Sequence, residues 1–188
     1  MRDSLLQRGL FSKPRLEGRA LEQALAGSKR RGVRMLNSRT QEWALVTDSR
    51  ALGAVALMKQ RAVSLKADMA KAGLSIQGAG RAARVGDGDI SVDVRAWVTE
   101  WSTEALLEVK WTRQSFSEAR AEAKNKIPVL KEACASGRWL QANGKPGKPI
   151  KAAAVGVLLV GPRAWDCSIH SIVGSKTATF GPKLINLF

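Results

Sequence analysis

The chain has 188 residues, and its 31 Lys and Arg against 16 Asp and Glu give a formal net charge of +15. This length suits one globular domain with a sizeable core, and so large a charge favours a polyanionic partner, of which nucleic acid is the usual one. The sequence shows no long apolar span or signal peptide, which argues against a membrane partner.

Two helices are predicted in the N-terminal part of the chain. The first covers residues 14–26, where apolar residues recur with an amphipathic period. The second covers 49–72, ends before Gly73, and carries the apolar residues Leu52, Val55, Leu57, Met58, Val63, Leu65 and Met69. The intervening run SKRRGVR, at 28–34, is the densest positive charge in the chain. It is interpreted either as a solvated loop or as a phosphate grip.

Two strands follow within DISVDVRAWVTEWSTEALLEVKWT, at residues 89–112. Alternation predicts that one face of the first strand is formed by Ile90, Val92, Val94, Ala96 and Val98, and one face of the second by Ala105, Leu107 and Val109. The linker 99–104 has the length of a hairpin connection. The opposite faces would carry Asp93 and Arg95 on the first strand, and Glu108 and Lys110 on the second. Antiparallel pairing would therefore bring Asp93 close to Glu108, with Lys110 facing the same pocket.

The elements downstream are a helix, a loop and two strands. Residues 115–135 predict a helix with Ser117 at the capping position, and Pro128 inside it indicates either a kink or two helices. The Gly-, Pro- and Lys-rich run 141–151 is interpreted as a backbone clamp or as a surface linker. The apolar run 152–161 predicts a fully buried central strand, and a further strand is expected at 165–173.

The carboxylates of the two adjacent strands suggest a metal site. Asp93 and Glu108 would repel one another, and a divalent cation between them would remove that penalty. With the backbone carbonyl of Val109 they would form an oxygen-ligated site suited to Mg²⁺ or Mn²⁺. The ion would polarise a phosphate and a water, and Lys110 would position the water or stabilise the transition state. The alternative is a solvated strand face on which charges alternate.

The pattern of Asp93 followed, after fourteen intervening residues, by Glu108-Val109-Lys110 resembles that of the PD-(D/E)XK nuclease superfamily. The resemblance covers roughly residues 80–162, with Val92 in place of the proline of the family name. It implies an α/β restriction-endonuclease-like core, with a central mixed sheet flanked by helices and an added N-terminal helical segment. We expect residues 1–73 to form that basic helical segment, packed on a nuclease-like core at 74–188 within one globular domain.

The resemblance also implies further site residues. Family members commonly supply one more carboxylate from a helix before the sheet, and of the available glutamates, Glu17, Glu22 and Glu42, we favour Glu22. The helix after the E-x-K strand often contributes a polar residue, so Arg120 or Lys124 is a candidate phosphate contact, with a solvated helix face as the alternative. The candidate nucleic-acid contacts together are Arg30, Arg31, Arg34, Arg95, Arg120 and Lys124. Trp97, Trp101 and Trp111 flank the predicted site, as base-stacking or as core residues.

Charge and cysteine usage agree with this hypothesis. Residues 1–80 hold 15 Lys and Arg against 6 Asp and Glu, and 131–188 hold 8 against 2, whereas 81–130 is balanced at 8 and 8. A basic frame would grip phosphates around an acidic, metal-holding centre. Cys134, Cys167 and the single histidine, His170, lack zinc-site spacing. Two free thiols predict a reducing intracellular compartment, cytoplasm or nucleoid, with a toxin delivered to a target cell as the alternative.

Three functions are compatible with the sequence. The first is a metal-dependent endonuclease, DNA favoured over RNA, with Asp93, Glu108, Lys110 and Glu22 as catalytic residues. The second is a non-catalytic nucleic-acid-binding or assembly module of the same fold. The third is a basic structural or virion protein. A homodimer and a complex with a partner protein are both open.

Overall fold

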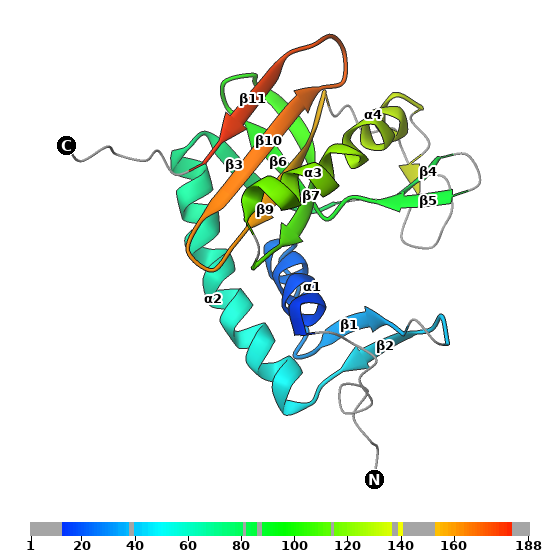
Figure 1. Cartoon of the computed structure of the whole chain (residues 1–188), viewed down its shortest axis with the longest axis vertical. Coiled ribbons are helices and arrows are strands. Elements are labelled where there is room, and N and C mark those ends of the chain that lie inside the picture. The colour runs from blue at the N-terminus through cyan, green and yellow to red at the C-terminus, as the bar shows by residue number, and fades with distance from the viewer. Residues whose placement is uncertain are drawn as a thin grey trace, which may run out of the picture.

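The computed structural model describes residues 13–37, 40–80, 82–85, 88–113, 115–136, 139–140 and 153–181 (Figure 1). The helices are α1 (Lys13–Leu25), α2 (Ser49–Lys71), α3 (Phe116–Lys124) and α4 (Lys126–Ser136). The strands are β1 (Val33–Leu36), β2 (Trp43–Val46), β3 (Leu74–Ala79), β4 (Ala82–Val85), β5 (Gly88–Ser91), β6 (Val94–Val98), β7 (Thr103–Trp111), β8 (Trp139–Leu140), β9 (Ala154–Val160), β10 (Trp165–Ser171) and β11 (Thr177–Phe180).

A six-stranded mixed sheet, in the order β11-β10-β9-β7-β6-β3, organises the described part of the chain. β7 and β9 pair in parallel, and the other neighbours are antiparallel. Parallel neighbours need a long crossover connection, and α3 and α4 lie in the segment between β7 and β9. All seven residues of β9 are buried, as predicted for the apolar run. The predicted α/β class with a mixed sheet is therefore confirmed at this level.

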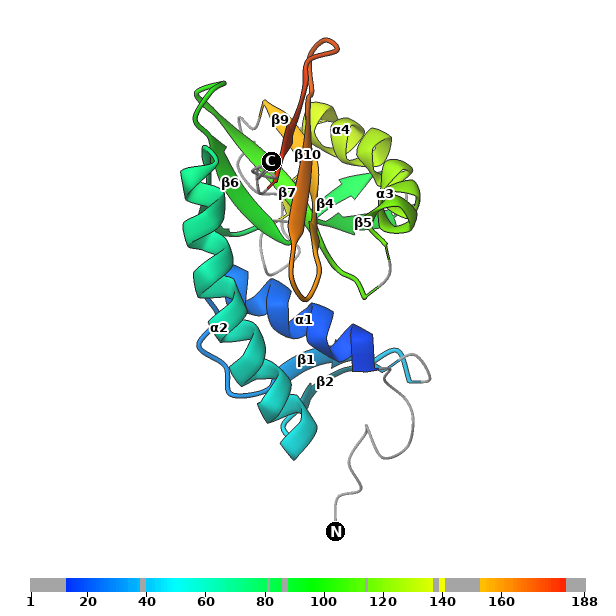
Figure 2. The same cartoon turned by 60° about the vertical axis from the view of Figure 1, so that its left-hand side comes forward.

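Helices cover both faces of the sheet (Figure 2). On one face, Val94, Leu107 and Val109 pack in a core shared with α1 and α2. On the other face, the sheet residues pack against α3 and α4; they are Leu106, Val155, Val157 and Leu159. Because both faces of β7 are covered, polar side chains near its end lie in a confined space between helices. Within the described part of the chain, no helix is both long and apolar enough to cross a membrane.

The predicted first strand, 90–98, is wrong as a single element. β5 ends at Ser91 and pairs with β4 in a separate small sheet of order β5-β4-β8, whereas β6 begins at Val94. Val92 packs in the α3–α4 core, on the opposite side of the sheet from Val94. The chain therefore changes direction at Val92 and Asp93, which alternation within one strand could not reveal. The hairpin from β6 to β7 was predicted, and is confirmed by their antiparallel pairing.

The predicted helices are present with corrected details. Pro128 lies in the first turn of α4, where its missing N–H costs nothing, so the segment forms two helices that meet at Asn125. Ser115, rather than Ser117, precedes α3, and its carbonyl accepts a hydrogen bond from the Ala119 N–H at 3.3 Å. α2 stops before Gly73, whose φ of +87° suits glycine.

The buried face of α2 is rotated from the predicted one, because small residues occupy it. Its buried residues are Ala51, Ala54, Met58, Ala62, Leu65 and Met69. Leu52, Leu57 and Val63 are exposed instead. The predicted loop at 141–151 lies outside the described residues.

The hairpin of β1 and β2 was not predicted. Its strands are only four residues long, too short for alternation to be distinctive. Val33, Met35 and Val46 are buried in the α1–α2 core, and Arg34, Trp43 and Leu45 are exposed. The basic run at 28–34 therefore leads into a strand that packs beside α1.

Glu17 fastens α1 to the end of β7. This carboxylate is only 5% exposed, and it accepts hydrogen bonds from the Trp111 Nε1–H at 2.9 Å and from the Arg113 guanidinium at 2.7 Å. Leu16 and Leu21 of the same helix are buried in the core. The tie sets the position of α1, and with it the position of Glu22 one and a half turns further along.

Replacing Glu17 tests this tie. Glu17→Ala should lower the free energy of unfolding by about 2 kcal/mol, because it removes the acceptor of the Trp111 indole and the partner of Arg113. Glu17→Gln should lose less, since its amide oxygen can still accept from Trp111. Urea unfolding followed by circular dichroism measures both, with Glu132→Ala on the exposed side of α4 as the control. Equal losses in all three variants would contradict the tie.

Candidate active site

The end of β7 presents different side chains to the two faces of the sheet. Val109 packs in the α1–α2 core, so its neighbours Glu108 and Lys110 project toward α3 and α4. Both charged side chains are only partly exposed. The sequence analysis predicted that Glu108 and Lys110 lie on the same side, and they do.

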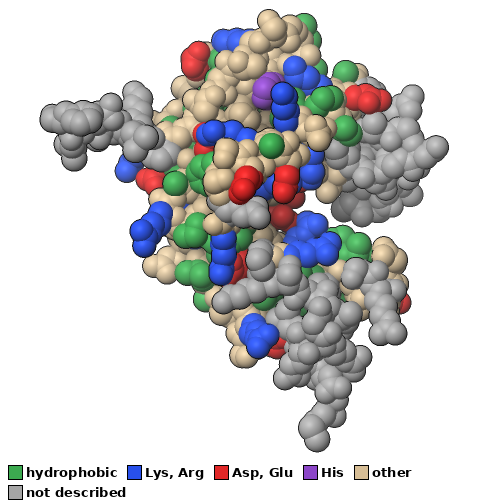
Figure 3. Space-filling view, in the orientation of Figure 1, with side chains coloured by type: hydrophobic (Ala, Val, Ile, Leu, Met, Phe, Trp, Pro, Cys, Tyr) green, Lys and Arg blue, Asp and Glu red, His purple; other side chains and the backbone are tan. Residues whose placement is uncertain are grey.

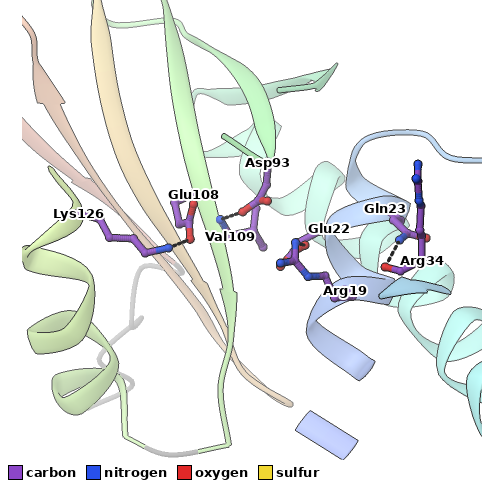
Figure 4. A network of polar contacts seen from close by, with 8 residues as sticks. All are labelled: Arg19, Glu22, Gln23, Arg34, Asp93, Glu108, Val109 and Lys126. Atoms are coloured by element: carbon purple, nitrogen blue, oxygen red, sulfur yellow. Dashed lines mark hydrogen bonds and ion pairs between the residues drawn. The ribbon is translucent and has the colours of Figure 1, made fainter. Parts of the chain in front are cut away.

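Asp93 approaches β7 from its edge rather than from a face. The Asp93 backbone N–H donates to Leu107 at 3.2 Å, and its carbonyl accepts from the Gly80 N–H at 2.8 Å. A Cβ at Gly80 would collide with the Val92 carbonyl oxygen, so glycine permits this close crossing. The Asp93 side chain then accepts a hydrogen bond from the Val109 N–H at 2.8 Å (Figure 4). The expectation that Asp93 shares the face of Glu108 is thus replaced by a position beside the strand.

The Val109 carbonyl points to the same edge of β7 as the Asp93 side chain. The N–H and C=O of one strand residue point the same way, so the Val109 carbonyl also faces the region beyond the start of β6. It lies on the edge of β7 that Asp93 occupies.

Three carboxylates from different parts of the chain influence one another at this point. Burial raises the pKa of Asp93 to about 8, and the negative charges of Glu22 and Glu108 add to the effect. Burial also raises the pKa of Glu22, with a contribution from Glu108 that Arg19 opposes. Glu22 comes from α1 and faces Asp93 across the gap in Figure 4. The structure therefore brings Glu22, Asp93 and Glu108 together.

Glu108 and Glu22 each form an ion pair with a basic side chain. Lys126, the first residue of α4, forms an ion pair with Glu108. Arg19, one turn before Glu22 on α1, pairs with it at 2.7 Å. Neither Lys126 nor Arg19 was predicted as a site residue from the sequence. For Lys126 the available signal was its place in the helical segment after the E-x-K strand.

Lys110 has a different partner from the one its position suggested. Its Nζ lies 3.5 Å from Glu122, an exposed residue of α3, rather than in a contact with Asp93. An ion pair that is open to solvent is worth little, at most about 1 kcal/mol. The lysine is therefore held loosely at the wall of the site.

Glu22, Glu108 and Lys110 line an open cleft of about 480 Å³, whereas the Asp93 side chain is bonded to the Val109 N–H beside it. Its walls come from α1, the end of β7 and the α3–α4 segment, with Arg15, Arg19, Glu22, Glu108, Lys110 and Lys126 among the lining residues. Figure 3 shows acidic and basic side chains meeting at a notch in the molecular surface. An anionic ligand would meet cations at the rim and carboxylates further in.

Most of the predicted nucleic-acid contacts lie elsewhere. Arg95 donates to the Ala79 carbonyl at 3.0 Å and lies 3.6 Å from Glu104, and Arg120 pairs with Asp166 at 2.9 Å. Lys124 and Arg120 line a separate, mainly apolar cavity. Arg30 and Arg31 are exposed before β1, and Arg34 lies over the ring of Trp43.

The predicted tryptophans have separate roles. Trp111 is held by Glu17, and Trp101 lies beneath Lys176, at 4.7 Å from Nζ to the ring centroid. Trp97 is exposed. His170 is a strand residue of β10, as expected, and burial lowers its pKa.

The donor set at the cleft fits a hard divalent cation. Asp93, Glu108 and the Val109 carbonyl offer oxygen atoms only, which Mg²⁺ and Mn²⁺ prefer. Burial is the main cause of the raised Asp93 pKa, and the charges of Glu22 and Glu108 add to it, so a cation beside these carboxylates would relieve their repulsion. Among the described residues, no three His, Cys, Asp or Glu side chains are gathered closely enough to hold one ion. The three carboxylates therefore do not form one ligand set in this arrangement, and the charge of Glu22 acts on Asp93 at least as strongly as that of Glu108.

Comparisons of the chain with protein-family models, with curated proteins and with solved structures gave no match. The case for a function therefore depends on the residues of the cleft.

The pKa of Asp93 predicts how stability depends on pH in the presence of a chelator. The folded chain holds the Asp93 proton up to a pKa of about 8, whereas the unfolded chain releases it near the ordinary value of 3.8. Between these values the folded state binds more protons, so the free energy of unfolding should fall as pH rises. Asp93→Asn cannot titrate, so it should be more stable than wild type near pH 8, by on the order of 1 kcal/mol or more.

Urea unfolding at intervals across this pH range provides the measurement. Asp68→Asn, an exposed change on α2, should follow the wild-type curve. A smaller fall should remain in Asp93→Asn, because the pKa of Glu22 is also raised. Parallel curves for wild type and Asp93→Asn would show that Asp93 does not hold this proton.

Proposed function

We propose that this protein is a metal-dependent endonuclease that hydrolyses phosphodiester bonds of nucleic acid, with DNA favoured over RNA. The observation that carries the proposal is that Glu22, Glu108 and Lys110 line one cleft, and that Asp93 lies close enough for the charges of both glutamates to raise its pKa. The resemblance to the PD-(D/E)XK superfamily had named the same four residues. Glu22 lies on a helix, Asp93 precedes β6, and Glu108 and Lys110 lie on the E-x-K strand, β7. Their meeting supports the restriction-endonuclease-like interpretation of the core.

The roles follow from the position of each group. Asp93, Glu108 and the Val109 carbonyl would hold Mg²⁺ or Mn²⁺. When bound, the ion would supply charge neutralisation for the phosphoryl oxygens and a lowered pKa for a bound water. Lys110 would stabilise negative charge on the phosphate, since its pairing with the exposed Glu122 is weak enough to give up. Glu22, whose raised pKa makes it a better proton acceptor than an ordinary carboxylate, would take a proton from water.

The cleft walls would orient the substrate. Arg15 and Arg19 on α1 lie on one side, and Lys126 on the other. Cations on two walls would fix a phosphate over the carboxylates, which by themselves would repel it.

Cleavage assays test this function. Wild type with Mg²⁺ or Mn²⁺ should cut plasmid, single-stranded DNA or RNA, and a chelator should abolish cutting. Asp93→Asn, Glu108→Gln and Lys110→Ala should each lower the rate by about 100-fold or more, because each removes charge that acts on the transition state. Glu100→Gln, in the exposed turn between β6 and β7, should cut like wild type.

The result must separate binding from chemistry. Gel-shift or anisotropy measurements in chelator should show that the three variants still bind nucleic acid. Cleavage that survives in all three would refute this active site.

A non-catalytic nucleic-acid-binding module is the second candidate, and one observation favours it. The two outer carboxylates are already neutralised, Glu108 by Lys126 and Glu22 by Arg19, so the cleft keeps its charges balanced with the protein's own side chains. A recognition module would need no ion. Absence of cleavage by wild type with every divalent metal, together with retained binding, would support this candidate.

Lys126 distinguishes the two candidates further. If Glu108 holds a metal, the Lys126 ammonium competes with it, and Lys126→Met should lower the Mg²⁺ concentration for half-maximal cleavage. Because a partly exposed ion pair contributes at most about 1 kcal/mol, this Mg²⁺ concentration should fall by about two- to fivefold. Lys71→Met, an exposed change at the end of α2, is the matched control. An unchanged or higher Mg²⁺ requirement in Lys126→Met would show that the lysine does not compete for this site.

A further inference from the structure

The outer face of the β1–β2 hairpin exposes large apolar side chains. Trp43 is 51% exposed and Leu45 is 55% exposed, whereas Val33, Met35 and Val46 fill the core from the inner face. A single exposed leucine is ordinary, but an exposed tryptophan ring is costly to leave in water. The inner face already secures the hairpin, so packing does not explain why Trp43 is at this position.

Two guanidinium groups flank the Trp43 ring. The Arg34 guanidinium carbon lies 5.6 Å from the ring centroid, and that of Arg19 lies 5.9 Å from it. Arg30 and Arg31 are exposed on the loop that leads into β1. Aromatic rings and planar guanidinium groups are the side chains on which nucleobases stack, and the cations also attract phosphates. This combination favours nucleic acid over an apolar protein surface.

The same residues connect the hairpin to the cleft. Arg19 contacts the Trp43 ring and also pairs with Glu22 at 2.7 Å. Gln23 Nε2 donates to the Arg34 carbonyl at 3.4 Å, which holds β1 beside α1 (Figure 4). The tryptophan ring is therefore one side chain away from the carboxylate group.

We propose that Trp43 stacks on an unpaired base of the nucleic acid that enters the cleft, so that the preferred ligand is single-stranded or locally unpaired. The inference extends the proposed nuclease function by naming its substrate class. A base within a duplex is already stacked on its neighbours, whereas an unpaired base gains by stacking on a side chain. The guanidinium groups of Arg19 and Arg34 then leave the face of the Trp43 ring and bind phosphates of the same nucleic-acid strand.

The test measures binding in chelator, so that it does not depend on cleavage. Trp43→Ala should weaken binding of a single-stranded oligonucleotide by about tenfold and leave duplex binding within about twofold. Trp43→Phe keeps an aromatic ring and should stay close to wild type. Leu57→Ala, which removes an apolar side chain that is 55% exposed on α2 outside the cleft, is the control and should bind both ligands like wild type.

A second measurement distinguishes loss of stacking from misfolding of the hairpin. Single strands should quench the tryptophan fluorescence of wild type more than that of Trp43→Phe, and circular dichroism should match between the two. Equal single-strand affinity in wild type and Trp43→Ala would overturn the inference, even if the protein cleaves. Loss of self-association in Trp43→Ala without a change in nucleic-acid binding would overturn it too, and would assign the hairpin to a protein interface. Selective loss of single-strand binding by a protein that never cleaves would support the stacking role and refute the nuclease.

Discussion

The hydrogen bond from the Val109 N–H to the Asp93 carboxylate determines how the cleft is built. β6 begins only at Val94, so β7 extends beyond its neighbour and leaves the Val109 amide without a strand partner on that side. The Asp93 side chain supplies the missing acceptor. The interaction satisfies a backbone donor and at the same time fixes a carboxylate beside the strand that carries Glu108. A break between β5 and β6 at Val92 and Asp93, where Gly80 allows a close approach to the Val92 carbonyl, makes this possible.

Charge balance is the second constraint on the cleft. Burying carboxylates near one another is costly, and the protein offsets the cost in two ways: Asp93 holds a proton, and Glu22 and Glu108 have basic partners. The partners come from helices on opposite sides of the sheet, Arg19 on α1 and Lys126 on α4. A ligand that brings its own positive charge would replace the proton and loosen these pairs. A ligand that brings phosphates would instead draw the basic partners away from the carboxylates.

Helices and strands with a strong local periodicity were predicted correctly from the sequence. Features that depend on contacts between distant parts of the chain were not. The amphipathic α1, the buried β9 and the β6–β7 hairpin follow from local patterns, and Glu22 was named through the family resemblance. The break between β5 and β6 at Asp93 depends on long-range pairing, which no alternation within 90–98 encodes. The α2 face was misjudged because alanines, not the larger Leu52 and Leu57, face the core where helices pack closely. Lys126 and Trp43 escaped notice because their contacts, Glu108 and Arg19, are distant in the sequence.

The cleft depends on the docking of one helix, α1, which Glu17 holds on β7. Glu22 approaches Asp93 only while α1 is seated on β7, and the bonds of Glu17 to Trp111 and Arg113 hold it there. These partners are far apart along the chain, so we expect them to meet after the local hairpin of β6 and β7 has formed. A partly folded chain with α1 detached would have Asp93 nearer its ordinary acidity and one wall of the cleft missing. The cleft would therefore be complete only when the first helix has docked on β7.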